Sequence, residues 1–133
     1  MAAQGLMTLP SVHVPKDTMD RLEAAVKAKG MTVFARIDHA AGATAAGLSL
    51  RPTELLIFGN AKAGTPLMQS VQAIGLDLPL KTLVWQDGVG DTWLSYNDPA
   101  WLASRHGLSG ETATAIRMMA AALETIAKTA TAR

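Results

Sequence analysis

The polar side chains that could bind a ligand stand at the ends of apolar segments. Asn60 lies in the run Gly59–Thr65 (GNAKAGT), directly after the apolar segment Thr53–Gly59. The glycine spacing and the threonine match part of the phosphate-loop pattern G-x-x-x-x-G-K-[ST], but the lysine before the threonine is missing. A nucleotide phosphate loop is therefore disfavoured. The remaining interpretations are a plain structural turn, or a Gly-rich loop that turns Asn60 and backbone N–H groups towards a cavity.

The pair Asp38–His39 is a second candidate for chemistry. A histidine titrates near neutral pH, so beside a carboxylate it can act as a general acid or base. The simpler interpretation is that Asp38 caps a helix starting at His39, and that His39 hydrogen-bonds locally. The sequence favours the simpler interpretation.

Charged residues also stand within apolar segments. Glu54 lies at the start of one such segment and Lys81 lies inside another. Charges in these positions point to solvent, pair with one another or line a cavity. Arg51 or Lys81 could hold an anionic substrate, and the hydroxyl of Tyr96 could reach the same cavity. The candidate ligand-binding residues are therefore His39, Arg51, Glu54, Asn60, Lys81 and Tyr96.

Metal and thiol chemistry find little support. The chain has no cysteine, which excludes disulfides, thiol catalysis and cysteine metal sites. Its three histidines, His13, His39 and His106, do not stand at metal-ligand spacing. No metal site is predicted, and the sequence names no cofactor.

Composition disfavours nucleic-acid and membrane partners. The 133 residues are 49% apolar and carry a net charge of +1, without the basic stripe of a nucleic-acid binder. Trp85, Trp93 and Trp101 are better explained by core or interface packing than by base stacking. No run of about 18 apolar residues and no signal-peptide pattern is present. We expect a cytoplasmic protein forming a single domain over residues 1–133.

Hydrophobic patterning predicts five strands, over Met7–Val14, Met31–Asp38, Thr53–Gly59, Leu80–Asp87 and Thr92–Asn97. Pro10 would place the first strand at an edge of the sheet, since proline cannot donate to a neighbouring strand. Strict alternation in the second strand would put Met31, Val33, Ala35 and Ile37 on one face. Asp87–Asp91 (DGVGD) reads as a hairpin turn.

Capping residues and apolar spacing predict five helices. The first helix begins at Pro15 and ends at Gly30, and the second runs from His39 to Gly47. The third covers Pro66–Ile74, with Thr65 as its cap, and the fourth begins at Asp98–Pro99 and continues through Arg105. The last begins at Ser109 and covers about residues 110–128. The segment Thr129–Arg133 is expected to fray. Mixed helices and strands with an antiparallel hairpin indicate an α+β fold.

Six segments, taken in order, resemble a bacterial and archaeal family known only as domain of unknown function 302. They are Thr18–Val26, Val33–Ala43, Leu50–Asn60, Gly64–Gln69, Leu76–Trp85 and Tyr96–Ala103, within about residues 6–108. The chain departs from the family at Ala61, where proline is common after Gly-Asn.

The resemblance implies a two-layer α/β sandwich similar to the TATA-binding-protein-like fold. Helices would cover one face of an antiparallel sheet, and the protein would be a homodimer. It implies no activity, and the fold name does not bring DNA binding with it. The positions that match the family and deserve testing are His39, Arg51, Glu54, Asn60, Lys81, Tyr96 and Asp98.

Three functional hypotheses follow, in this order. The first is a domain that binds a small, anionic ligand in a pocket near the Gly59–Thr65 loop. The second is a homodimeric structural or protein-interaction module without a ligand. The third is an enzyme that uses His39 with Asp38 or Glu54 as acid and base, although no complete catalytic group is visible.

Overall fold

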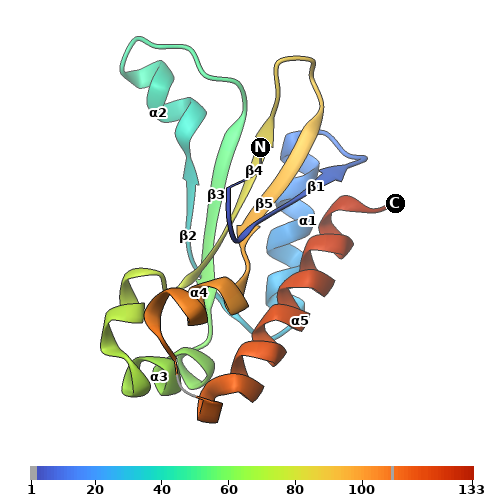
Figure 1. Ribbon diagram of the computed structural model, residues 1–133. Helices are drawn as coiled ribbons and strands as arrows, with labels where there is room; N and C mark the ends of the chain where they lie inside the picture. Colours follow the sequence, from blue (N-terminus) through green and yellow to red (C-terminus); the bar gives the residue numbers. More distant parts are fainter. Residues whose placement is uncertain (1–2, 109) are drawn as a thin grey trace.

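The computed structural model describes residues 3–108 and 110–133. Its centre is one five-stranded sheet in which every pair of neighbours is antiparallel (Figure 1). The order across the sheet is β1-β5-β4-β3-β2. The strands are β1 (Leu6–Ser11), β2 (Thr32–Asp38), β3 (Thr53–Gly59), β4 (Leu80–Gln86) and β5 (Thr92–Asn97). The predicted α+β class and antiparallel sheet are confirmed.

Five α-helices connect and cover these strands. They are α1 (Pro15–Ala28), α2 (His39–Ala45), α3 (Ala61–Ser70), α4 (Pro99–His106) and α5 (Ala113–Thr131), and two short 3-10 segments span Gln72–Leu76 and Gly110–Thr112. Pro15 and Pro99 occupy first-turn positions, where a missing N–H costs nothing. Ser109, the predicted start of the last helix, lies outside the described residues.

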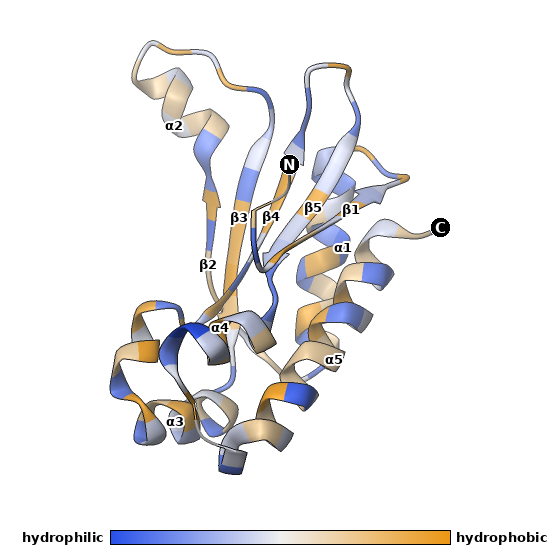
Figure 2. Cartoon of the chain, viewed as in Figure 1, coloured by the Kyte–Doolittle hydropathy of each residue, from blue (hydrophilic) through white to orange (hydrophobic). Residues whose placement is uncertain are grey.

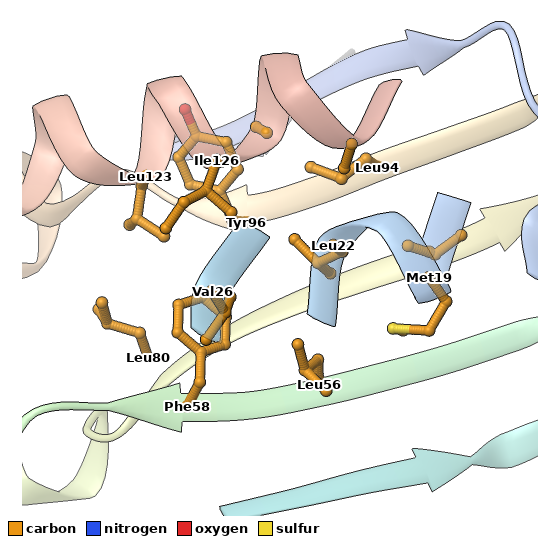
Figure 3. Close-up of a cluster of buried hydrophobic side chains, with 13 residues drawn as sticks. Met19, Leu22, Val26, Leu56, Phe58, Leu80, Leu94, Tyr96, Leu123 and Ile126 are labelled. Atoms are coloured by element: carbon orange, nitrogen blue, oxygen red, sulfur yellow. The ribbon is translucent and has the colours of Figure 1, made fainter. Parts of the chain in front are cut away.

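The core lies between the sheet and the helices α1 and α5, which pack on the same face (Figures 1 and 3). Helix α1 contributes Met19 and Leu22, which are fully buried. They meet Leu56 and Phe58 of β3, whose lower half is coloured as strongly hydrophobic in Figure 2. Each buried aliphatic or aromatic side chain contributes about 1.5–3 kcal/mol of transfer free energy. This burial holds α1 and α5 on one face. In the described part of the chain no helix packs across the opposite face of the sheet, here called the open face.

Strand β2 does not alternate as the sequence predicts. Val33 pairs with Phe58, but the next residue in register with β3 is Ala35, opposite Ile57, so Phe34 is an extra residue in a β-bulge. Val33 therefore packs against the core, whereas Ala35 and Ile37 lie on the open face. The expectation that they share a face with Val33 is wrong, because one inserted residue reverses the alternation.

Helix α3 begins earlier than predicted. The sequence places a loop over Gly59–Thr65 and a helix over Pro66–Ile74, but the helix starts at Ala61 with Asn60 as its cap. Pro66 lies inside it as the sixth residue, where it cannot donate the backbone hydrogen bond that another residue would give to the carbonyl of Lys62. The Asn60 side chain, rather than Thr65, accepts the capping hydrogen bond.

The C-terminal segment is held in place instead of fraying. Helix α5 continues through Thr131, and the backbone N–H of Val12 donates to the carbonyl of Thr131 at 3.0 Å. The Arg21 guanidinium donates to the carbonyls of Thr129 and Ala132, at 3.1 Å each. The expectation of fraying is wrong, because these hydrogen bonds hold the end of the chain. Their partners lie more than 100 positions earlier, so the local sequence does not show them. The Pro10 prediction is confirmed, since β1 is an edge strand.

Replacing Leu22 by Ala should lower the free energy of unfolding by about 2–5 kcal/mol, because a fully buried side chain leaves a cavity. Chemical denaturation measures this change. Leu76 is 75% exposed and supplies the matched control, for which Ala should cost less than about 0.5 kcal/mol. Equal losses for the two variants would contradict this arrangement of the core.

Candidate functional site

A cavity of about 830 Å³ opens at the end of the sheet where β3 runs into α3. This volume lies in the upper part of the range of roughly 300–1,000 Å³ that small-molecule sites occupy. Most of its wall is apolar and comes from Met31, Phe34, Met68, Leu78, Pro79, Leu80, Met118 and Met119. The cavity is here called the α3 pocket.

The α3 pocket exists because the surrounding elements present small side chains on one side and long ones on the other. Ala61, Ala63 and Gly64 begin α3 and project little into the space beside them. Opposite them, the β2 bulge places Phe34 at the rim, where it remains 56% exposed. Bulges commonly redirect a side chain in this way. The pocket therefore depends on a register shift that the sequence pattern does not show.

Asn60 holds the start of α3. Its Oδ1 accepts a hydrogen bond of 2.8 Å from the backbone N–H of Lys62. Its carbonyl oxygen accepts from the N–H groups of Ala63 and Gly64, at 3.0 and 2.9 Å. Its side-chain nitrogen donates no hydrogen bond to residues 3–108 or 110–133, and Asn60 is exposed, so that donor is open to solvent or to a ligand. Among the six candidate residues, Asn60 is the one that lines the α3 pocket.

Two lysines, Lys29 and Lys62, also line the α3 pocket, and among residues 3–108 and 110–133 no carboxylate does. Lys62 lies in the first turn of α3, which contains no acidic residue. A helix begins at the positive end of its dipole, so a lysine there is unfavourable by about 0.3–1 kcal/mol. Neither lysine forms an ion pair within the part of the chain that the structure describes. The pocket is thus apolar with an excess of positive charge.

Glu54 belongs to a different cluster, on the face of the sheet that carries the helices. Its two carboxylate oxygens accept hydrogen bonds of 2.6 and 3.1 Å from Arg36, which also donates to Asp20 at 2.9 Å. Hydrogen bonding to Glu54 raises the pKa of Arg36, and hydrogen bonding to Lys16 lowers the pKa of Asp20. Glu54 is therefore engaged in an ion-pair network and does not line the α3 pocket.

His39 and Arg51 lie at the opposite end of β2 and β3 from Asn60. The Asp38 carboxylate accepts from the backbone N–H of Ala41 at 2.9 Å, so it caps α2. The guanidinium of Arg51 lies beside Gly88 in the turn between β4 and β5. The capping interpretation of Asp38 is confirmed, and the topology keeps these residues away from the α3 pocket.

Lys81 and Tyr96 also lie outside the α3 pocket. Lys81 is on the open face, and its Nζ donates to the carbonyl of Pro79 at 3.1 Å. Tyr96 is in the core with 7% of its surface exposed, and burial followed by nearby negative charge raises its pKa. It lines a smaller cavity of about 330 Å³ together with Asp98, Glu124 and Lys128. The structure thus separates the six candidate residues into different places.

Sequence reasoning missed most of the pocket wall. Lys29 follows α1, Met31 precedes β2, and Met118 lies on α5, so these residues are distant in sequence and meet only in the fold. Met118 is 68% exposed and faces the pocket from α5, whereas Met119 lines the pocket and also packs against both buried clusters. Within the described ranges, no group of three or more His, Asp or Glu side chains could hold a metal ion.

Comparison with known proteins gives one consistent family. The model of the family described as "Domain of unknown function DUF302" matches residues 7–126. A solved structure titled as an uncharacterized conserved protein DUF302 from Bacillus stearothermophilus superposes with a TM-score of 0.85. That superposition covers 96% of this chain and 99% of the other, at 19% sequence identity. At this identity the likeness shows the fold, which is the predicted family fold.

Curated relatives carry a different kind of name. The chain is 52% identical over 124 residues to "Fluoride-specific ion channel FluC 1" of Brucella suis biovar 1 (strain 1330), covering 93% of this chain and 49% of the relative. The match to the protein of that name in Brucella abortus biovar 1 (strain 9-941) has the same identity and covers 46% of the relative. The chain therefore spans about half the length of these relatives. In the portion described here, no helix has the length and apolar character needed to cross a membrane.

Replacing Asn60 by Ala should remove the cap of α3 and lower the free energy of unfolding by about 1 kcal/mol. Amide hydrogen exchange should rise first at Lys62, whose N–H donates to the Asn60 side chain, and less at Ala63 and Gly64, which donate to the backbone carbonyl that alanine retains. Asn60→Asp keeps an oxygen acceptor and serves as the matched control, with little change expected. Unchanged exchange in Asn60→Ala would contradict the capping role.

Proposed function

The chain belongs to the family described as domain of unknown function DUF302, and we propose that it is a small-molecule-binding domain. The family description names no activity. The ligand would occupy the α3 pocket. Function has to be argued from the site, because a fold shared by many proteins does not specify one.

The observation that carries the proposal is the pocket itself. About 830 Å³ of space with an apolar wall and a few polar groups, among them Asn60 and Lys62, is the usual composition of a ligand site. The apolar wall supplies affinity by removing ligand surface from water, at about 25 cal/mol per Å². The polar groups at the start of α3 orient the ligand.

The enzyme hypothesis has weaker support. His39 follows Asp38, which lies opposite Glu54 across β2 and β3, but the Glu54 carboxylate is paired with Arg36 and the Asp38 carboxylate caps α2. A histidine–carboxylate pair that sequence reasoning missed does exist, with His106 Nε2 at 2.6 Å from Asp77 Oδ2. That pair joins α4 to the segment before β4, and neither residue lines either of the two cavities described above. We therefore assign it a structural role.

The names of the Brucella relatives describe whole proteins about twice the length of the matched region. Ion conduction is part of the names of those proteins, and we do not propose it for this chain. For the matched half we propose the same ligand-binding role as for this chain.

A second candidate function, a homodimeric interaction module, is favoured by the open face. Strand register places Ile37, Leu55, Leu83 and Trp85 on it, and Trp85 stacks on Trp93 with ring centroids 6.2 Å apart. Among strand residues on this face, Lys81 carries the only charge. A broad apolar surface of this kind is typical of protein interfaces. We propose that two copies pair through it, which leaves the α3 pocket accessible.

Filling the α3 pocket should abolish ligand binding. Ala122 lines the pocket from α5, so Ala122→Trp puts an indole into the space, whereas Ala121→Trp places the same group on the exposed side of the helix. A ligand at ten times its Kd should stabilise the wild-type chain by about 1.4 kcal/mol, or roughly 3–8 °C in Tm. A thermal-shift screen of a broad metabolite library should show hits with the wild type and Ala121→Trp, and none with Ala122→Trp. A library without such hits would contradict the proposal.

Placing a charge on the open face should break the dimer. Ile37 is 40% exposed there, and Ile37→Lys would bury an ammonium group in a symmetric apolar interface. Met7 is 43% exposed on the other face of the opposite edge strand, so Met7→Lys is the control. Native mass spectrometry should find a dimer for the wild type and Met7→Lys, and a monomer for Ile37→Lys. A monomeric wild-type chain would exclude this candidate.

A further inference from the structure

We propose that the α3 pocket takes an amphiphile with one anionic head group, of the class of medium- to long-chain carboxylates. This inference rests on the proposed ligand-binding function and names the chemistry of the ligand. It follows from the kinds of side chain in the wall, from their charge and from the volume of the pocket.

Four of the large apolar side chains in the wall are methionines. Met31 precedes β2, Met68 belongs to α3, and Met118 and Met119 belong to α5, so the four thioethers come from three sides. Methionine is unbranched and changes rotamer easily, which lets a wall of methionines follow a flexible chain better than a rigid ring system. A flexible alkyl chain is the ligand that this wall fits.

The rim exposes apolar surface that a ligand would cover. Phe34 is 56% exposed and Met118 is 68% exposed, and both line the same cavity. Exposed large apolar side chains that gather at one hollow mark a binding site more often than scattered ones do. An alkyl chain lying between these two side chains removes their surface from water as well as its own.

The charge in the pocket calls for an anionic group. Lys29 and Lys62 bring two positive charges, and no carboxylate of the described residues lines the cavity to neutralise them. Lys62 adds its charge to the positive end of the α3 dipole, an unfavourable placement that an anion at the same position would reverse. The free side-chain nitrogen of Asn60 can donate to the same oxygen atoms.

The number and kind of polar groups limit that head group to a small one. A nucleoside polyphosphate carries more negative charge than two lysines balance, and the segment lacks the G-K-[ST] end of a phosphate loop. A peptide would need a row of backbone partners, whereas the wall offers chiefly side-chain carbon and sulfur. One carboxylate matches two lysines and one amide donor.

Binding of dodecanoate below its critical micelle concentration tests the proposal directly. Isothermal titration calorimetry of the whole chain should show one site for dodecanoate, weaker binding of dodecanol, which has the same chain and no charge, and none of acetate. The double variant Lys29→Met/Lys62→Met should bind dodecanoate about tenfold more weakly, with dodecanol unchanged, since two partly exposed ion pairs are lost. Lys27 pairs with Glu23 outside the pocket, so the control variant Lys27→Met should bind dodecanoate as the wild type does.

Two variants and one lipid separate the outcomes. Ala122→Trp should abolish dodecanoate binding and Ala121→Trp should keep it, which ties the signal to the α3 pocket. Equal affinity for dodecanoate and dodecanol, unaffected by the lysine variants, would overturn the anionic head group. Binding to phosphatidylglycerol vesicles without binding to monomeric dodecanoate would overturn the assignment of a free ligand.

Failure of this inference differs from failure of the proposed function. If neither amphiphile binds, but other compounds give thermal shifts that Ala122→Trp removes, the ligand class is wrong and the binding function stands. If no compound gives a shift that depends on Ala122, both are overturned.

Discussion

Burial of one face of the sheet beneath α1 and α5 is the interaction on which the rest of the molecule depends. Met19 and Leu22 of α1, with Leu123 and Ile126 of α5, close over β3, β4 and β5 (Figure 3). The two helices come from opposite ends of the chain and pack against each other. Since both helices pack on the same face, they cover neither the other face nor the end of the sheet. The end of the sheet is where α3 lies (Figure 1).

The α3 pocket is a consequence of how that end is closed. Helix α3 leaves β3 through a capped start made of small residues, so it approaches the sheet without filling the space beside it. The bulge in β2 then turns Phe34 towards the opening. A strand without the bulge would keep regular alternation and would not bring this ring to the rim. One local irregularity thus connects sheet register with the shape of the proposed site.

The charged residues fall into two groups with different roles. The Arg36 guanidinium donates short hydrogen bonds to the carboxylates of Glu54 and Asp20. These bonds join α1 to the edge of the sheet. Lys29 and Lys62 have no such partners in the described structure, and they stand beside apolar surface. A charge that the fold leaves without a partner beside a cavity is the better sign of a ligand than one inside a network.

Elements whose signals are local could be predicted from the amino-acid sequence. The bounds of β3 and β5 are those predicted, because apolar runs bounded by proline, glycine and Asp-Gly turns need no knowledge of their neighbours. Asp38 and Asp98 were recognisable as caps for the same reason. The family resemblance supplied the two-layer arrangement with helices on one face.

Other features depend on residues that are distant in the sequence, and they are visible only in the tertiary structure. The β2 bulge follows from pairing with β3, and Lys29 and Met118 line the same cavity only because of the fold. Side-chain alternation is a property of one strand, whereas register and cavities arise between strands and helices, and no single segment carries that information.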